Sequence, residues 1–297
     1  MARTGCLRGD GVIPPQPETT GKSPLRPFNF PDSTTMPIRR TATALLALLV
    51  AGCAHNVPLP ASDASQWADA RQMVLVTSAD WDATGGELRR YEREGDGWRQ
   101  VGEAVPVTLG RSGSGWGLGL NPHRGDGPVK REGDGKAPAG VFAIGTAFGY
   151  ADSARTGLRY QAMTANDWCI DVPASNYYNR IIDRSTVKAP YLDQSSEPMR
   201  RDIHVDGDQR YREGFVIEHN EGGAARQGGS CIFAHLWKAP GETTAGCTAM
   251  APASMDALLA WLDARRKPVF VLLPKAQYAA LRQDWKLPEI TAQEARP

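Results

Sequence analysis

The chain has 297 residues, of which 41% are hydrophobic and 23% are charged, a balance typical of a globular protein with a substantial core. Its 34 basic and 33 acidic residues leave a net charge of +1, which excludes the strongly basic surface that nucleic-acid-binding proteins use. Glycine (31 residues) and proline (22 residues) are abundant, which favours a turn-rich β fold over a helical bundle.

The segment that begins at Met36 has the features of an export signal. Arg39 and Arg40 precede a short apolar run over residues 42–50, which is too short to span a bilayer. The run ends in Val-Ala-Gly-Cys at residues 50–53, which resembles the lipobox of bacterial lipoproteins. That resemblance implies cleavage before Cys53, acylation of its thiol, and a periplasmic, lipid-anchored protein. The alternatives are an ordinary secretory signal and a chance apolar stretch.

The signal divides the chain into five predicted parts. Residues 1–35 are rich in Pro, Thr and Arg and are interpreted as a mis-annotated leader upstream of the true start at Met36. Residues 36–52 form the signal peptide, and residues 53–70 form a tether. A single folded domain is expected over 71–275, followed by a tail over 276–297. Ala54 stands where an inner-membrane retention signal has Asp, so we expect the outer membrane.

The domain is predicted to consist mainly of strands. Its turns are expected at Gly85-Gly86 and at residues 95–97, and one helix is expected over 251–268, with Pro252 in its first turn. Alternating or continuous apolar runs predict strands at 73–81, twice within 83–102, and at 105–110, 139–150, 214–220, 231–237 and 269–274.

Three cysteines lie within the expected domain. Cys169 and Cys231 lie beside strand-like segments, where they could form a disulfide or remain two buried free thiols. Cys247 differs, because it lies among turn residues and follows Gly246, whose missing side chain lets a ligand approach the backbone. We expect the following helix to lower the pKa of this thiol, and we expect His235 to accept its proton. The spacing alone is weak evidence for catalysis.

Three sequence motifs together resemble the YkuD-type L,D-transpeptidase catalytic domain. They are the Ala-Pro-Ala-Gly-Val-Phe run at 137–142, a strand that carries His235, and Thr-Ala-Gly-Cys at 244–247. The resemblance implies a mostly β fold, a β-sandwich of mixed sheets with a few short helices. It also implies that Cys247 forms a thioester with a peptidoglycan stem peptide, that His235 is the general base, and that no cofactor is needed. The amides of Gly246 and Cys247 are the expected oxyanion donors.

The backbone carbonyl that orients the histidine in this family is sought here in the Gly222-Gly223 or Gly228-Gly229 turn. Four residues are candidates for substrate binding: Thr244, Trp237, Tyr178 and Glu197.

Two departures from the family motif leave the reaction open. Ala245 replaces a second histidine and Ala249 replaces an arginine, whose fork of donors could hold a carboxylate. Transfer to an amine is therefore weighed against hydrolysis by an L,D-carboxypeptidase or amidase of the same family, and against an inactive wall-binding lipoprotein. A papain-like protease is disfavoured, because here the histidine precedes the cysteine. We expect a monomer.

Other residues invite a functional interpretation without strong support. His204 and His219 could join His235 at a metal, but their spacing matches no closed zinc pattern, so no metal is predicted. Trp116, Trp168, Tyr177 and Tyr178 could line a glycopeptide groove, but aromatic residues in a β fold are more often core.

Overall fold

The computed structural model describes residues 66–121 and 126–290. The leader, the signal peptide and the lipidation site Cys53 lie outside the described residues. The described strands are β1 (Gln72–Ser78), β2 (Gly85–Glu94), β3 (Gly97–Thr108), β4 (Ser114–Trp116), β5 (Ala137–Gly149), β6 (Tyr160–Ala162), β7 (Asp167–Cys169), β8 (Ile181–Asp183), β9 (Glu197–Pro198), β10 (Glu213–Ile217), β11 (Phe233–Leu236), β12 (Thr248–Met250) and β13 (Val269–Pro274). The described helices are α1 (Arg201–His204), α2 (Pro252–Trp261) and α3 (Lys275–Leu281), and three 3-10 turns are η2 (Leu192–Gln194), η3 (Glu221–Gly223) and η4 (Ala264–Arg266).

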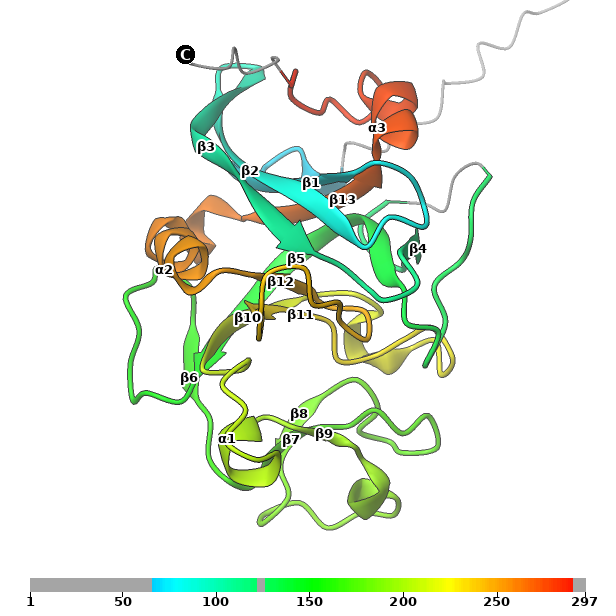
Figure 1. Ribbon diagram of the computed structural model, residues 1–297, viewed down its shortest axis with the longest axis vertical. Helices are drawn as coiled ribbons and strands as arrows, with labels where there is room; N and C mark the ends of the chain where they lie inside the picture. Colours follow the sequence, from blue (N-terminus) through cyan, green and yellow to red (C-terminus); the bar gives the residue numbers. More distant parts are fainter. Residues whose placement is uncertain (1–65, 122–125, 291–297) are drawn as a thin grey trace, which may run out of the picture. The chain divides into compact units, whose positions relative to one another are not determined.

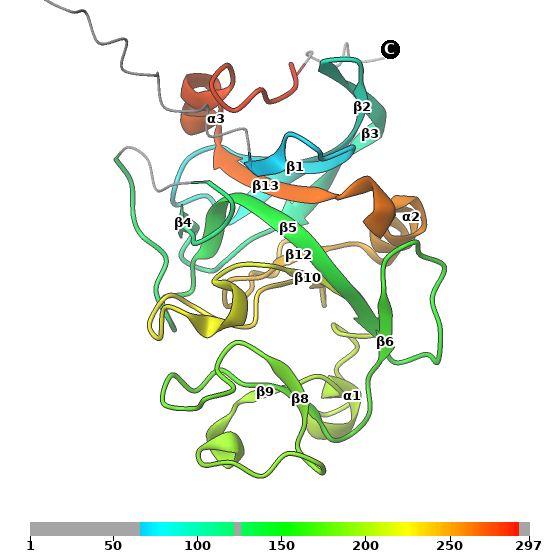
Figure 2. The same ribbon diagram turned by 180° about the vertical axis from the view of Figure 1, so that it is seen from behind.

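The large sheet is built around two strands that are buried along their whole length, β1 and β13. They pair in parallel, with Leu75 opposite Val271, and lie side by side in Figures 1 and 2. Their continuous apolar sequences fit this position, because a strand covered on both faces has no polar face to present to water. The order of the sheet is β10-β11-β12-β3-β2-β1-β13-β5-β4, with β6 added beside β5.

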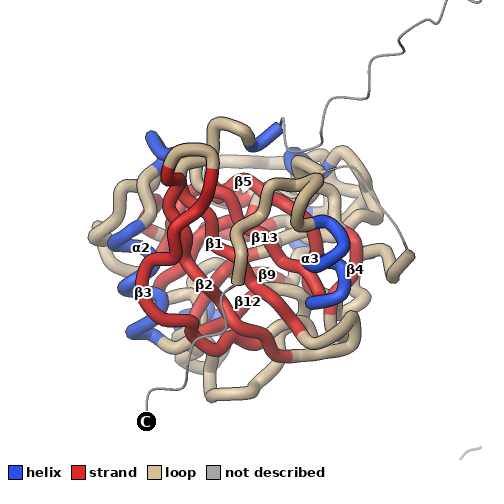
Figure 3. Tube along the Cα trace, turned by 90° about the horizontal axis from the view of Figure 1, so that it is seen from above, coloured by secondary structure: helices blue, strands red, loops and turns tan. Residues whose placement is uncertain are grey.

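The path of hydrogen-bonded strands returns to its beginning, because β10 pairs with both β11 and β5. Parallel and antiparallel pairs occur together, so the predicted mostly β fold with mixed sheets and few short helices is confirmed. Seen from above in Figure 3, the strands cross the middle of the domain, and α2 and α3 lie on opposite sides of them. A second, three-stranded sheet has the order β8-β7-β9.

Of the two predicted turns, one is present and the other is part of a strand. The β2–β3 hairpin turns at Gly95 and Asp96, as expected, with Gly95 at a φ of +56°. Gly85-Gly86, however, forms the start of β2 instead of a turn. A Cβ at Gly86 would lie 2.9 Å from the carbonyl oxygen of Thr77, so glycine is needed here for close approach of the neighbouring strand.

The helix predicted over 251–268 is shorter than expected. α2 begins at Pro252 but ends at Trp261, because Leu262 has an extended backbone. Arg265 and Arg266, expected at its C-terminus, belong to η4. The predicted apolar face is present: Met255, Leu258 and Leu259 are buried, and α2 packs against β10 and β11.

The ordered domain extends beyond both predicted boundaries. Trp67, assigned to the tether, is buried with its ring 5.6 Å from that of Trp285, which was assigned to the tail. α3 packs on β13 and β1, and Tyr278 and Leu287 are also buried. These sparse apolar residues lie in otherwise polar segments, which is why composition alone placed both segments outside the core. None of the helices among residues 66–121 and 126–290 is long and apolar enough to cross a membrane.

Candidate active site

His235 lies on β11 of the large sheet, between β10 and β12. It is buried, with 4% of its surface exposed, and its Nδ1 is 2.7 Å from the carbonyl oxygen of Leu236. A carbonyl can only accept a hydrogen bond, so Nδ1 carries the proton, and Nε2 of the neutral ring is left as a base. Burial lowers the pKa of His235 to about 4, helped by the nearby Arg210 and Arg201 cations. The imidazole is therefore neutral at pH 7.

The carbonyl that orients His235 is that of its own neighbour, Leu236. The prediction that a glycine turn supplies this carbonyl is wrong. Gly228 does accept from a histidine, but the donor is Nε2 of His219, at 2.9 Å. Sequence cannot assign carbonyls to histidines that lie on different strands.

Cys247 immediately precedes β12, beside the histidine strand. β11 and β12 run parallel with Ala234 opposite Thr248, so Cys247 lies next to Phe233, two residues before His235 along β11. Cys247 and His235 line the same pocket. The sulfur accepts a hydrogen bond from the Phe233 amide at 3.4 Å and donates to the Cys231 carbonyl at 3.5 Å. The side chain of Cys247 is thus held from two sides.

The resting state of Cys247 contradicts the sequence-based expectation. β12 separates Cys247 from α2, so the positive end of the helix does not reach the sulfur. Burial, together with the negative charge of Glu197, raises the pKa of the thiol to about 12. Cys247 is therefore a neutral thiol in the unliganded protein, and the predicted lowering of its pKa is wrong.

The side chain of Thr244 stabilises the loop before the cysteine with two hydrogen bonds. The hydroxyl of Thr244 donates to the carbonyl of Cys247 at 2.6 Å and accepts from the amide of Gly246 at 3.1 Å. Gly246 has a φ of +151°, and a Cβ there would lie 2.9 Å from the carbonyl oxygen of Lys136. The Gly246 amide is therefore already used within the loop, which weakens its predicted role as an oxyanion donor. Outside the strand ladders, the described part of the chain offers no partner to the Cys247 amide, which leaves it as the better donor.

A pocket of about 340 Å³ opens onto these side chains. Its lining comes from β9, α1 and β11 and from loops, including the segment that leads into β12. The lining residues are Arg111, Lys130, Glu132, Gly133, Asp171, Ser196, Glu197, Arg201, Arg210, Tyr211, Ser230, Cys231, Ile232, His235, Thr244, Ala245, Gly246 and Cys247.

Charged side chains dominate this lining, and most of them are paired. Arg201 contacts Glu197 at 3.2 Å and Asp208 at 2.8 Å, and Arg210 also contacts Asp208. These cations hold the pKa of Asp208 well below its usual range. Arg111 is exposed and forms no ion pair with any described residue. A pocket with this mixture suits a polar ligand that carries its own charges.

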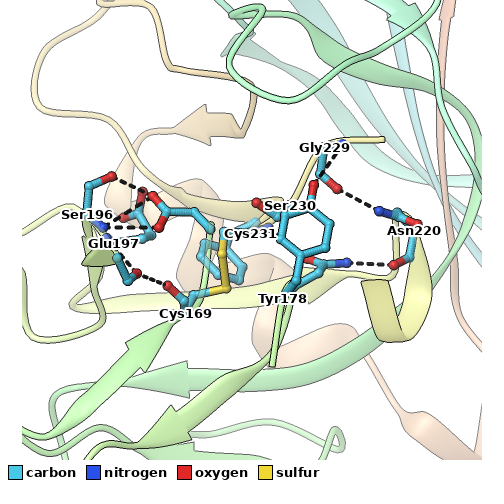
Figure 4. The surroundings of a disulfide bond; sticks show 12 residues. Cys169, Tyr178, Ser196, Glu197, Asn220, Gly229, Ser230 and Cys231 are labelled. Carbon is cyan, nitrogen blue, oxygen red and sulfur yellow. Dashed lines mark hydrogen bonds between the residues drawn. A yellow bond between two sulfur atoms is a disulfide. The ribbon is translucent and has the colours of Figure 1, made fainter. Parts of the chain in front are cut away.

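The disulfide of Cys169 and Cys231 joins the small sheet to the segment before β11 (Figure 4). The two residues are 62 positions apart in the chain, and their Cα atoms are 5.9 Å apart. The question that the sequence left open, disulfide or two free thiols, is thereby answered. Cys247 is the free cysteine among residues 66–121 and 126–290.

The four candidate substrate-binding residues separate into two groups. Thr244 and Glu197 line the pocket, whereas Trp237 and Tyr178 do not. Tyr178 is fully buried, and its hydroxyl donates to Glu132 and accepts from the Gly229 amide at 3.2 Å (Figure 4). Tyr178 therefore contacts the pocket only indirectly, by hydrogen-bonding to the lining residue Glu132.

The remaining aromatic and histidine candidates lie away from the pocket. Trp116 is buried in the main core, and His219 is buried with Nδ1 accepting from the Leu118 amide at 3.1 Å. His204 is exposed and contacts the Ala165 carbonyl. Within the described ranges, no three His, Cys, Asp or Glu residues gather as metal ligands.

Most of the charged pocket residues were not predicted from the sequence, among them Arg201 and Arg210, and neither was their neighbour Tyr211. These three residues lie in a charged segment, residues 200–212, that carries no motif and reads as surface. The only available signal was the isolated aromatic residue directly before the strand β10, and that signal is weak.

In the described part of the chain, the fold and the pocket define a β-sheet domain with one free, buried cysteine directly before β12. On the neighbouring parallel strand β11 lies a histidine whose ring hydrogen-bonds to a backbone carbonyl. Comparison with protein families matches residues 87–271, more than half of the chain, to the model described as the L,D-transpeptidase catalytic domain, YkuD. The chain therefore belongs to the YkuD L,D-transpeptidase family. No curated protein and no solved structure matches it.

Proposed function

We propose that the protein is a cysteine acyltransferase that acts on peptidoglycan stem peptides through a thioester on Cys247. The observation that carries the proposal is the pairing of β11 with β12, which brings Cys247 and His235 to one pocket. The hydrogen bond from Nδ1 to Leu236 supports the role of Nε2 as the base.

The first half of the reaction forms the thioester. The Cys247 sulfur attacks the peptide carbonyl of the donor as His235 Nε2 takes the thiol proton. The resulting oxyanion is stabilised by the Cys247 amide. The tetrahedral intermediate then breaks its C–N bond, and the protonated imidazole gives its proton to the departing amine.

The second half regenerates the thiol. An amine from an acceptor stem peptide attacks the thioester, loses a proton to His235, and displaces the Cys247 sulfur, which takes that proton back. The product is a new peptide bond. If water attacks instead, the product is a free carboxylate, and the enzyme is a hydrolase.

The resting protonation states favour a reaction that begins only when substrate is bound. In the empty pocket the thiol pKa is about 12 and the imidazole pKa is about 4, so the proton stays on sulfur. An incoming carbonyl shares the developing negative charge, so the sulfur need not become a free thiolate first.

Hydrolysis is the second candidate, and one observation favours it. Ala245 is exposed at the pocket and Ala249 lies in β12, where the family motif places histidine and arginine. Without those two side chains the pocket has fewer groups to position an acceptor stem peptide, for example by its carboxylate.

Incubation of the full-length protein with purified muropeptides, with products identified by mass spectrometry, tests both candidates. Formation of a crosslink indicates transfer, and loss of a terminal residue indicates hydrolysis. C247A is expected to be inactive and H235Q to be strongly impaired, whereas H204Q is expected to retain full activity because His204 lies outside the pocket. Activity in C247A would contradict the thioester mechanism.

We further propose that the protein is exported and anchored to the outer membrane by a lipid on Cys53. The support is the charged n-region, the apolar run and the Val-Ala-Gly-Cys sequence at residues 50–53. C53S is expected to move the protein from the membrane fraction to the soluble periplasmic fraction. An unchanged distribution would contradict the proposal.

A further inference from the structure

Tyr211 occupies a fixed position beside the histidine. Only 4% of its surface is exposed, and its ring centroid lies 5.1 Å from that of His235. The same ring makes T-shaped contacts with Phe148 and Phe233, at 5.8 Å and 5.5 Å between centroids. The guanidinium of Arg201 lies 5.3 Å from the same ring. The hydroxyl therefore cannot swing away from the pocket.

Glu197 also lines the pocket, on a strand that pairs with the disulfide-bonded Cys169. Glu197 pairs with Cys169 across β9 and β7, and Cys169 is bonded to Cys231 (Figure 4). The Cys231 carbonyl in turn contacts the sulfur of Cys247. Arg201 fixes the carboxylate itself, at 3.2 Å. Strand pairing followed by the disulfide thus connects the glutamate to the segment that touches the free thiol.

Tyr211, Glu197 and Cys247 line the same pocket, and the Tyr211 hydroxyl favours the charged form of both the Glu197 carboxyl and the Cys247 thiol. A phenol has a single proton to donate, so it can serve only one of them at a time. The negative charge of Glu197 opposes ionisation of Cys247, whereas a hydrogen bond from Tyr211 favours it. The two residues therefore act on the sulfur in opposite directions.

We propose that Tyr211 and Glu197 are positioning residues that together set the reactivity of Cys247. When the Glu197 carboxyl is ionised, it holds the Tyr211 proton and repels a thiolate. When the carboxyl is neutral, Tyr211 turns its proton to the sulfur and stabilises it. Binding a substrate that neutralises or displaces Glu197 would then activate the nucleophile. The inference rests on the proposed function only in taking Cys247 as the nucleophile.

Other charges also face this cluster. They come from α1, from the segments before β10 and after β7, and from the loop before β5. They are Arg201, Arg210, Asp208, Asp171 and Lys130, together with neutral His235 on β11. Because these groups are unchanged in variants of Tyr211 or Glu197, their effects cancel in the comparison with the wild type.

The test is the rate of alkylation of Cys247 by iodoacetamide in the full chain, followed by peptide mass spectrometry from pH 7 to 11. E197Q is expected to alkylate about tenfold faster than wild type at pH 9, because removal of the charge lowers the thiol pKa by about one. Y211F is expected to alkylate about tenfold more slowly, because the sulfur loses its donor. In E197Q, Arg201 keeps Asp208 as its partner at 2.8 Å.

Matched controls separate this effect from damage to the fold. Y150F removes a hydroxyl from a tyrosine packed on the same cluster as Tyr211, and E213Q neutralises a glutamate on β10; neither residue lines the pocket. Both controls are expected to alkylate at the wild-type rate. A change in the same direction in Y211F and E197Q would indicate loosening of the pocket and overturn the proposal.

The proposal is also overturned if Cys247 in either variant is alkylated at the wild-type rate. The proposed function fails by a different result, which is turnover of muropeptides by C247A. The two failures are therefore distinguishable.

Discussion

At the scale of single residues, the site is governed by the removal of water from a thiol and an imidazole. Burial disfavours the charged form of each group, so it raises the pKa of the acid Cys247 and lowers that of the base His235. Both effects keep the pair neutral. A neutral pair is protected from adventitious chemistry, since the thiolate is the species that reacts with oxidants and alkylating agents.

The raised pKa of Cys247 predicts a distinctive pH profile for the folded protein. Below the thiol pKa of about 12 the sulfur stays protonated, so alkylation is expected to remain slow at pH 7 to 9 and to rise steadily through pH 11. In denaturant the same thiol should titrate near ~8.5, like a free cysteine. Site-resolved alkylation of Cys247 in both states measures the difference. A native midpoint below 8 would contradict the burial argument.

The lowered pKa of His235 predicts that the base remains available in acid. Its neutral form is lost only as pH falls through about 4, so the acid limb of kcat/KM assigned to His235 should lie below pH 5. H235Q is expected to reduce kcat by ~10²- to 10⁴-fold. The pH dependence of muropeptide turnover checks the first point and single-turnover kinetics the second. An acid limb near pH 6.5 would mean that the pKa of His235 is that of a solvent-exposed histidine and would contradict the prediction.

At the scale of elements, the disulfide and the three-stranded sheet supply one wall of the pocket. The segment from β7 to β9 has few buried apolar residues of its own, so its position depends on the covalent bond to Cys231. The same bond positions the carbonyl that contacts Cys247. The Cys169–Cys231 disulfide thus affects both the position of the small sheet and the surroundings of the Cys247 sulfur.

Removal of this disulfide should affect both stability and turnover. A bond that closes 62 residues of chain stabilises the fold by ~4 kcal/mol in the chain-entropy model, so the double variant C169S/C231S should lose ~2 to 4 kcal/mol of unfolding free energy. Urea titration measures the loss. Dithiothreitol should lower the stability of the wild type and leave the double variant unchanged. Equal stability of reduced and oxidised wild type would contradict the argument.

At the scale of the whole domain, the two ends of the ordered chain close the core together. Trp285 is fully buried, 5.6 Å from Trp67 and 6.3 Å from Trp116. Trp116 ends β4, which pairs with the 137–142 run that carries the family resemblance. The segment after residue 275 therefore supports the core that carries the site.

Truncation of the Trp285 side chain should destabilise the domain strongly. W285A is expected to lower the unfolding free energy by ~3 to 5 kcal/mol, because a large cavity opens between two other indoles. The exposed Leu118, at 44% exposure, provides the control, since L118A should change stability by less than ~1 kcal/mol. Thermal or urea unfolding compares the two. Similar small effects in both variants would indicate that residues 275–290 are dispensable.

Local sequence was sufficient wherever a signal lies within a few consecutive residues. The apolar runs predicted β1 and β13, the Gly95-Asp96 turn predicted the hairpin, and the motifs around residues 137–142, 235 and 247 predicted the family that the comparison confirms. These features depend on period, turn chemistry and motif order, all of which are local.

Tertiary structure alone decided how distant groups affect one another. The disulfide, the Leu236 carbonyl on His235, and the position of Tyr211 and Glu197 around Cys247 all join residues from separate elements. The protonation of Cys247 is the clearest case: the sequence places a helix nearby, but the folded chain buries the thiol and inserts a strand before the helix. A pKa depends on solvent exposure and on charges within a few ångströms, and neither quantity is defined until the chain has folded.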